Sequence, residues 1–188
     1  MMKSEQKIFC RLMKEEDLEM VMNWRMMPEI TRFMYTDPKI TLDRQIIWFN
    51  TLKECKGNFL WIIEVDDIPA GVMTITDIDY KNKRCSPIFY IAEIDKRSLE
   101  GALRIEWSMF EFIFDKLNMN KFNSEVFSFN KGVIRLHQMC GCSIEGVLKD
   151  HIFKNDEFYD VTLLGLTKRE WENKKQKFKY LPIGFEVI

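Results

Sequence analysis

Hydrophobic and polar positions in the first third of the chain predict a short strand followed by two helices. Residues 7–13 mix apolar and charged types, as an edge strand does. Residues 15–25 then repeat apolar positions at helical spacing, and this pattern ends near Pro28. A second helix is expected after Thr41, whose side chain can cap a helix N-terminus. Its apolar face consists of Ile46, Ile47, Phe49 and Leu52.

The middle of the chain changes to strand patterns and then returns to a helix. The runs 59–65 and 71–78 are rich in β-branched and aromatic residues and flank the turn Asp66-Asp67, so they predict a hairpin. Residues 87–91 predict a third strand with a proline at its first position. Residues 99–117 predict a long helix, because apolar side chains recur there at three- and four-residue steps.

The last third of the sequence predicts a strand, a short helix and a hairpin. The strand covers residues 121–129, and the helix begins after Asn130 and ends at Gly141, a suitable pair of capping residues. Two further apolar runs, 144–154 and 157–166, flank a dipeptide typical of a two-residue hairpin turn, Asn155-Asp156. This order of elements indicates one α+β domain built on a central mixed sheet.

Composition and charge argue against several classes of protein. The chain has 188 residues, 46% apolar and 30% charged, which fits one globular domain rather than a disordered chain. Its formal net charge of −1 argues against binding nucleic acid mainly through phosphates. No apolar run reaches the roughly 20 residues needed to span a membrane, and the first residues lack the hydrophobic core of a signal peptide. We therefore expect a cytoplasmic protein with no nucleic acid or membrane partner.

The cysteines fit reduced thiols better than a disulfide framework. They are five in number and unevenly spaced. His137, Cys140 and Cys142 are close together in the sequence, but a structural zinc site needs a fourth ligand and the chain has no second cysteine pair beside them. We therefore expect no metal.

The segment around the predicted short helix resembles the GNAT superfamily of acyl-CoA-dependent N-acetyltransferases. It reads NKGVIRLHQMCGC over residues 130–142, followed by Glu145-Gly146, and has the spacing of that superfamily's N-x-x-A-I-x-L-Y-x-x-x-G-F-x-x-E-G signature. The earlier Asn23-Trp24-Arg25 and Phe33-Met34-Tyr35 resemble its RimJ/RimL-like branch. Within that branch the pattern is most similar to the UDP-4-amino-sugar N-acetyltransferases of the pseudaminic acid pathway.

This resemblance implies a fold and a domain organisation. The GNAT-like sheet is mixed, mostly antiparallel and twisted, and helices flank it. The acetyltransferase domain is expected to span residues 7–171. The tail, residues 172–188, ends in an apolar stretch, so we expect it to pack on the core or on a second subunit, which makes a homodimer possible.

The resemblance also implies an activity, with acetyl-CoA as co-substrate. The leading acceptor is the 4-amino group of a UDP-4-amino-4,6-dideoxy-N-acetyl sugar of surface-glycan biosynthesis, acetylated by direct attack in a ternary complex. Alternative acceptors are a protein N-terminus, a polyamine or an antibiotic amine. Two departures leave open a non-catalytic module that binds acyl-CoA or a nucleotide-sugar. The phosphate loop, usually Q/R-x-x-G-x-G/A, reads KRSLEGA at 96–102, and His137 replaces the usual tyrosine.

Three residues are candidates for catalysis. Glu125, in an otherwise apolar strand, can deprotonate the amine directly or through a water that Thr74 helps to hold. His137 has the position of the family's general acid and can protonate the departing thiolate while it is itself charged, so activity should fall at high pH. Each also has a structural interpretation: a solvent-facing strand residue, a packed β-former and a packed histidine.

The start of the predicted long helix is the candidate site for acetyl-CoA. Backbone N–H groups there can bind a pyrophosphate, small residues let the backbone approach it, and Glu100 is expected to face solvent. The alternative is an ordinary connection between a strand and a helix. A backbone donor for the oxyanion is expected within residues 88–93. The full set of candidates is Ile91, Lys96, Arg97, Leu99, Glu100, Gly101, Ala102, Leu103, Asn130 and Ile134.

The first two helices and their connection are expected to bind the acceptor. Arg25 can bind a phosphate through two hydrogen bonds, or pair with Glu29 four residues later. The resemblance implies that sugar or base contacts come from Met34, Tyr35, Trp48 and Tyr90.

Overall fold

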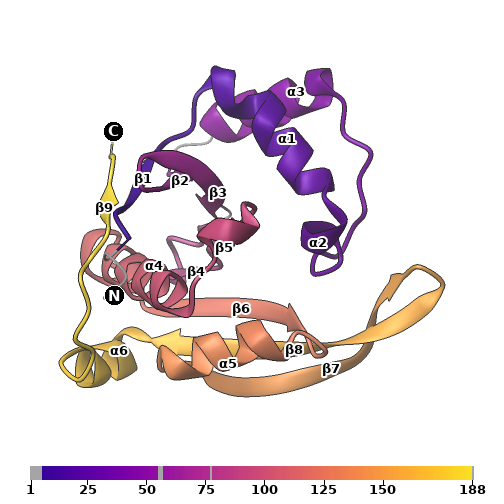
Figure 1. Cartoon of the computed structure of the whole chain (residues 1–188). Coiled ribbons are helices and arrows are strands. Elements are labelled where there is room, and N and C mark those ends of the chain that lie inside the picture. The colour runs from indigo at the N-terminus through magenta and orange to yellow at the C-terminus, as the bar shows by residue number, and fades with distance from the viewer. Residues whose placement is uncertain (1–5, 55–56, 77, 188) are drawn as a thin grey trace.

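The computed structural model describes residues 6–54, 57–76 and 78–187, which form two β-sheets with helices packed on them (Figure 1). The first sheet has the order β5-β3-β2-β1-β9 and the second the order β4-β6-β8-β7. Neighbouring strands are antiparallel except β1–β9 and β4–β6. The strands are β1 (Ile8–Leu12), β2 (Phe59–Val65), β3 (Ile68–Ile75), β4 (Arg84–Cys85), β5 (Ile88–Ile91), β6 (Lys121–Phe127), β7 (Ser143–Lys154), β8 (Glu157–Thr167) and β9 (Gly184–Phe185).

The helices lie in separate groups (Figure 1). Helices α1, α2 and α3 lie on one side of the molecule, and α5 lies against the second sheet on the other. A π-helical turn, Phe112–Lys116, extends α4. The α-helices are α1 (Leu18–Met26), α2 (Pro28–Thr31), α3 (Leu42–Glu54), α4 (Leu99–Glu111), α5 (Lys131–Met139) and α6 (Lys168–Lys175). The predicted α+β class is confirmed, and in the described residues none of these helices is long and apolar enough to cross a membrane.

Local capping and turn chemistry sets the ends of several elements as predicted. The Asn130 side chain accepts a hydrogen bond from the Val133 N–H and begins α5. Gly141 follows this helix with φ +102°, a conformation that glycine adopts without strain. Asn155 and Asp156 have φ of 53° and 62°, which matches the twist of the β7–β8 hairpin.

The single central sheet expected from the sequence is in fact two sheets. Strand β4 pairs with β6 only through Arg84–Lys121 and Cys85–Phe122. Strand β5 pairs with β3. Within the described residues, no strand therefore bonds to the outer edge of β5 or to the corresponding edge of β6 over 123–127. The sheet is therefore divided between β5 and β6, and neither strand has a strand partner for its backbone groups along this gap in the described residues.

Alternation along β2 places two hydrophobic clusters on the two faces of the first sheet. Trp61 and Ile63 belong to the larger cluster, which includes the α4 residue Phe110. Leu60 and Ile62 belong to the smaller cluster beneath α1 and α3. Because apolar residues occupy both faces of β2, the strand packs against a hydrophobic cluster on each side of the sheet.

The last described residues add β9 to the first sheet. Gly184 and Phe185 pair with Phe9 and Cys10 of β1. The Phe185 ring packs against Trp61, whose indole N–H donates to the Glu186 carbonyl at 2.8 Å. These contacts place the tail on the core.

Candidate active site

Glu125 lies on the face of β6 that meets the loop after α2. Its side chain is exposed, and its Oε2 accepts a hydrogen bond from the Tyr35 hydroxyl at 2.9 Å. The Tyr35 ring also packs edge-on against Phe127, with 5.2 Å between ring centroids. Burial and the neighbouring carboxylate raise the pKa of Tyr35, which keeps its hydroxyl a hydrogen-bond donor. Two predicted site residues, one from each half of the chain, are thus brought together.

A cavity of about 270 Å³ lies beside this pair. Phe127, Phe129 and Tyr159 form an aromatic group in its wall, with ring centroids 5.0 to 5.5 Å apart. Lys154 is buried and donates to the carbonyls of Thr31 and Met34. The complete lining is Arg32, Phe127, Phe129, Lys154, Asn155 and Tyr159. The tip of the β7–β8 hairpin therefore adjoins the region predicted to bind the acceptor, which the sequence assigned only to the first two helices.

Arg25 lies close to this region with part of its guanidinium unsatisfied. Its Nη2 donates to Thr36 Oγ1 at 3.2 Å, whereas Nη1 is buried without a hydrogen-bond partner. Burial lowers the pKa of Arg25, opposed by Tyr90 and Asp37. Burial also raises the pKa of Tyr90 to about 12, opposed by Arg25. The described hydrogen bonds of Arg25 go to Thr36, so the alternative pairing with Glu29 does not form.

Two predicted residues are not brought into contact with Glu125. Trp48 lies on α3 and is 37% exposed, and Figure 1 shows α3 on the opposite side of the molecule from β6. Thr74 pairs with Leu60 and Ile88 within the first sheet. In the described residues, no hydrogen bond joins either side chain to Glu125.

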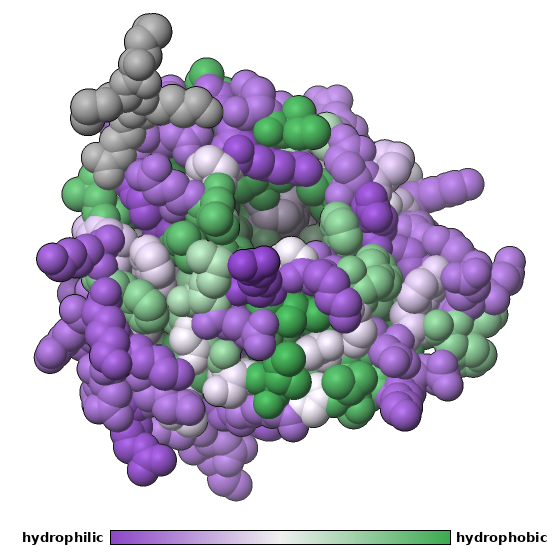
Figure 2. Space-filling view, turned by 60° about the horizontal axis from the view of Figure 1, so that its bottom comes forward, coloured by the Kyte–Doolittle hydropathy of each residue, from purple (hydrophilic) through white to green (hydrophobic). Residues whose placement is uncertain are grey.

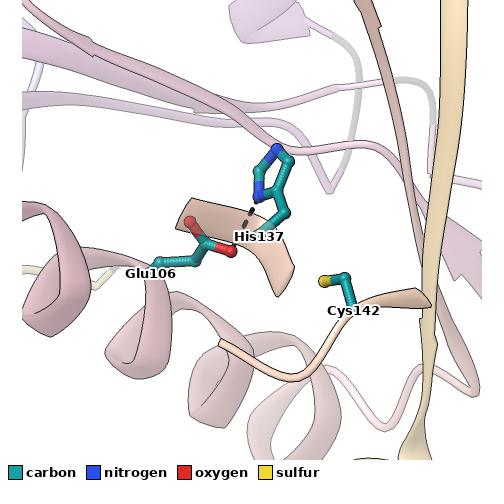
Figure 3. A group of neighbouring side chains, drawn as sticks. All are labelled: Glu106, His137 and Cys142. Atoms are coloured by element: carbon teal, nitrogen blue, oxygen red, sulfur yellow. Dashed lines mark hydrogen bonds and ion pairs between the residues drawn. The ribbon is translucent and has the colours of Figure 1, made fainter. Parts of the chain in front are cut away.

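His137 lies on the opposite face of β6 from Glu125. Its Nε2 is 3.2 Å from Ser124 Oγ, and its Nδ1 is 2.7 Å from Glu106 Oε1 (Figure 3). Glu106 is fully buried on α4, and its second oxygen has no hydrogen-bond partner. Sequence reasoning missed Glu106 and Ser124. A signal was present, because Glu106 occupies the apolar face of its helix between Leu103 and Phe110.

Glu106, His137 and Cys142 form a compact group of possible metal ligands. One donor atom from each lies within 4.8 Å of the others, and this is the one such group among the described residues. His137 Nδ1 is already hydrogen-bonded to Glu106. Burial, followed by the Glu106 charge, raises the pKa of Cys142, which favours a neutral thiol over the thiolate that a metal requires. The group fits a hydrogen-bonded pair beside a thiol better than a ligand set.

The start of α4 presents fewer free N–H groups than the sequence predicted. The Gly101 N–H donates to Ser98 Oγ at 3.0 Å, and the Ala102 N–H donates to the Ser98 carbonyl. Ser98 is held in turn by Gln6, whose Oε1 accepts from its hydroxyl. Because the cap uses these N–H groups, the exposed Leu99 and Glu100 are the positions left for a phosphate. Glu100 is exposed, as expected.

The other residues predicted to bind acetyl-CoA are mostly engaged in contacts within the protein. Arg97 donates to the carbonyls of Ile91 and Ala92 at 2.9 and 3.1 Å, and thereby fixes the end of β5. The Lys96 carbonyl accepts from Gln6. Leu103 lines a second cavity, of about 390 Å³, with Trp107 and Tyr180. Ile134 packs in the main core, and the Asn130 side chain caps α5.

The facing edges of β5 and β6 present extended backbone that no strand pairs with in the described residues. Their unpaired N–H and C=O groups can bond to an extended chain, as in strand addition. The β5 edge includes residues 88–91, within the predicted range of the oxyanion donor. Figure 2 shows hydrophobic side chains around a hollow on one face of the molecule.

Comparison with known proteins identifies the family. Residues 10–163 match the family described as Acetyltransferase (GNAT) domain. The chain is 33% identical over 119 residues to the SPbeta prophage-derived uncharacterized N-acetyltransferase YokL of Bacillus subtilis, covering 62% of this chain and 66% of YokL, slightly under two thirds of that relative. It is 25% identical over 171 residues to the uncharacterized N-acetyltransferase p20 of Bacillus licheniformis, covering 88% of this chain and 96% of p20.

A solved structure has the same fold. Spermidine N-acetyltransferase from Vibrio cholerae, in complex with CoA and spermine, superposes with a TM-score of 0.82 at 18% identity, covering 89% of this chain and 99% of that one. The family match extends over most of the chain and includes β5 and β6, the two strands with free edges. The chain therefore belongs to the acetyltransferase (GNAT) family and is an acetyl-CoA-dependent N-acetyltransferase.

Proposed function

We propose that this enzyme acetylates the primary amine of a small molecule that also carries an anionic group. The leading acceptor is the 4-amino group of a UDP-4-amino-4,6-dideoxy-N-acetyl sugar. The observation that supports it is the buried Arg25 Nη1, which lacks a partner. A phosphate oxygen would satisfy that donor, and a guanidinium is well suited to phosphate. Arg32, in the wall of the neighbouring cavity, adds a second positive charge.

Glu125 acts as the general base in this proposal. Its carboxylate is exposed and its orientation is held by the Tyr35 hydroxyl. The amine loses its proton to Glu125, directly or through water, and attacks the thioester carbonyl in a ternary complex. The aromatic group formed by Phe127, Phe129 and Tyr159 supplies an apolar wall on which a sugar ring can pack.

A polyamine is the second candidate acceptor. The observation that favours it is a carboxylate next to several aromatic rings, an arrangement that attracts an ammonium group. The Vibrio cholerae enzyme of this fold is a spermidine N-acetyltransferase. A second carboxylate nearby, Asp37, is already paired with Lys154 at 2.8 Å, so it is less available to an ammonium group than Glu125.

The experiment presents the purified enzyme with acetyl-CoA and, separately, the UDP-4-amino sugar, spermidine and a peptide, and detects acetylated products by mass spectrometry. We expect the sugar nucleotide to be acetylated. Glu125→Gln should lower kcat by about 100-fold, the effect of losing a general base. Arg25→Lys should raise the KM of the sugar nucleotide by about tenfold and leave that of acetyl-CoA unchanged. Arg84→Lys, an exposed arginine paired with Asp79, serves as the matched control.

Other outcomes point to the alternatives. Turnover of spermidine but not of the sugar, without an effect of Arg25→Lys, would select the polyamine. Modification of the peptide alone would select a protein N-terminus. Binding of acetyl-CoA without turnover of any amine would contradict a catalytic role and favour the binding module.

A further inference from the structure

Three polar side chains form a hydrogen-bonded chain that runs from the free edge of β6 into the core. Ser124 lies in the part of β6 that has no strand partner on its β5 side, and it is half-buried. His137, on α5, contacts Ser124 through Nε2 at 3.2 Å and Glu106, on α4, through Nδ1 at 2.7 Å. This is the connectivity of a serine–histidine–carboxylate triad, in which the acid orients the imidazole. We propose that these residues are a proton relay that protonates the coenzyme A thiolate, with Glu106 as its positioning residue.

The proposed relay requires one particular tautomer of His137. It works with an ionised Glu106, which only accepts hydrogen bonds, so in the proposed state Nδ1 donates to Glu106 across the 2.7 Å contact. The neutral imidazole then has a bare Nε2 directed at the Ser124 hydroxyl, and the imidazolium donates through both nitrogens. A second proton at Nε2 is therefore placed for transfer toward Ser124, at the end of the chain nearest the free strand edge.

The surroundings of the relay keep this arrangement fixed. The Phe122 ring packs against the imidazole with 5.6 Å between ring centroids. The titratable groups close to the relay are the thiols of Cys140 and Cys142, and burial raises the pKa of both, so they stay neutral. Glu106 is the carboxylate that contacts His137, and it is fully buried. The charges of Lys174, Glu170 and Glu145 act on the neighbouring Cys142.

In the proposed step one bond forms, one bond breaks and the released thiolate is protonated through the relay. The amine forms a C–N bond with the acetyl carbon, and the C–S bond breaks with its electron pair remaining on sulfur. The thiolate takes the Ser124 hydroxyl proton, and Ser124 Oγ takes the proton from His137 Nε2. His137 is left neutral and keeps its Nδ1 proton, which stays hydrogen-bonded to Glu106, and the solvent restores the Nε2 proton after the products leave. The general acid usual in this family, a tyrosine, is replaced here by three residues from α4, α5 and β6.

The first test detects the tautomer without any acceptor. The chain has two histidines, and His151 is exposed, so it serves as an internal reference in two-bond ¹H–¹⁵N NMR spectra. We expect neutral His137 to be protonated at Nδ1, whereas His151 should show the Nε2 tautomer usual for a free imidazole. Glu106→Gln should abolish this preference at His137 alone, and added CoA should shift the His137 signals but not those of His151. A neutral His137 protonated at Nε2 would overturn the proposal.

The second test measures the pH dependence of turnover with the best acceptor from the panel. Glu106→Gln should lower kcat by about 100-fold with an unchanged KM for acetyl-CoA, and should move the alkaline limb of the profile to lower pH, because an amide does not stabilise the imidazolium. Glu106→Asp should recover part of the activity. Ser124→Ala should lower kcat by at least tenfold, whereas the control Ser128→Ala, whose hydroxyl pairs with Thr162, should not.

The remaining variants keep the result independent of folding defects. In a His137→Tyr background, which restores the family residue, Glu106→Gln should no longer move the profile. A shift that persists there would contradict the relay. Acetylated Ser124, seen by mass spectrometry after incubation with acetyl-CoA alone, would also contradict it and make the serine an acyl carrier. Stoichiometric metal in the purified enzyme, lost in Cys142→Ala, would show instead that Glu106 and His137 are ligands. If none of the acceptors is acetylated, the proposed acceptor is wrong, and the NMR test of the His137 tautomer still decides whether the relay is assembled.

Discussion

At the scale of single residues, Arg11 and Arg25 differ in how fully their guanidinium groups are paired. Arg11 makes two hydrogen bonds of 2.7 Å to the carboxylate of Asp17, and its Nε makes a third to Glu64. Asp17 also accepts from the Lys14 N–H, so this network fixes the start of α1 against the first sheet. Arg25, with one nitrogen unsatisfied, has no comparable structural use. That contrast is why we assign it to ligand binding.

The Asp17 pair predicts an acid-sensitive contribution to stability. Burial opposes ionisation of Asp17, but hydrogen bonds from Arg11 and Lys14 lower its pKa overall. A carboxyl group whose pKa is lower in the folded state stabilises the protein at pH values above its unfolded-state pKa of about 3.9. That contribution is lost as the pH falls toward the folded-state pKa. Asp17→Asn should therefore cost about 3 kcal/mol near neutral pH and progressively less below about pH 4, measured by urea unfolding. The exposed Asp95→Asn should change little at either pH; an Asp17→Asn cost independent of pH would contradict this account.

At the scale of elements, Lys154 connects the β7–β8 hairpin to the loop after α2. Its ammonium group donates to two carbonyls of that region and pairs with Asp37, and Asn155 adds a bond to the same carboxylate. Figure 1 shows the hairpin curving toward α2. One wall of the cavity beside Glu125 and Tyr35 thus depends on the bond between Lys154 and Met34, which are 120 positions apart in the sequence.

Lys154→Met should loosen this connection and affect the acceptor more than the donor. The variant leaves two carbonyls and one carboxylate without their partner, so we expect a loss of about 3 kcal/mol in unfolding free energy. The KM of the acceptor should rise several-fold while that of acetyl-CoA stays constant. Lys149→Met, an exposed lysine on the same strand, is the control. An equal rise of both KM values would mean that the hairpin does not act on the acceptor side alone.

Helix α5 offers two glycines whose replacement should have opposite effects. Gly141 has φ +102°, and a Cβ there would lie 3.0 Å from Lys174 Cδ, so Gly141→Ala should destabilise by about 1–2 kcal/mol. Gly132 is exposed in the first turn, and a Cβ there would lie 3.9 Å from Asn130 Oδ1, an ordinary van der Waals contact, so Gly132→Ala should stabilise by about 0.5–1 kcal/mol. Thermal unfolding of both variants tests this, and a destabilising Gly132→Ala would contradict it.

Features governed by neighbouring residues were predictable from the sequence, and features governed by distant contacts were not. The cap at Asn130 and the turn at Asn155-Asp156 follow from local backbone preferences. The split sheet depends on where β4 stops pairing, and the cavity depends on Lys154, neither of which has a local signature. At the site, Glu125 was recognisable as a carboxylate in an apolar strand. Tyr35 was a candidate acceptor contact only through family resemblance, and its pairing with Glu125 was not predicted. Glu106 lies in a regular helical pattern, and its pairing with His137 has no local signature because the two residues are 31 positions apart.

At the scale of the whole molecule, the C-terminal tail closes the first sheet. Strand β9 covers the edge of β1, and the Ile183 N–H donates to Ser108 on α4. Phe185 adds its ring to those of Trp61 and Phe112. We propose that residues 172–188 stabilise the domain through these contacts, whatever the oligomeric state.

Two single substitutions test the tail without shortening the chain. Phe185→Ala removes an aromatic ring from the cluster and should destabilise by about 2–3 kcal/mol. Val187→Ala, at a side chain that is 58% exposed, should have little effect. Urea unfolding gives the stability and light scattering gives the mass. If Phe185→Ala dissociates a dimer while the subunit keeps its stability, the tail serves association rather than the core.

The two faces of β6 separate the two proton transfers of the proposed reaction. Glu125 and its Tyr35 partner lie on one face, and Ser124 with His137 lies on the other. Among the described side chains, no hydrogen bond therefore joins the Glu125–Tyr35 pair to the relay. In each turnover the enzyme would release one proton to water from the first face and take one up on the second, so the two steps draw on independent proton supplies. A slip of one position in the pairing of β6 with β8 would exchange these faces, which makes the register of this strand a condition for catalysis.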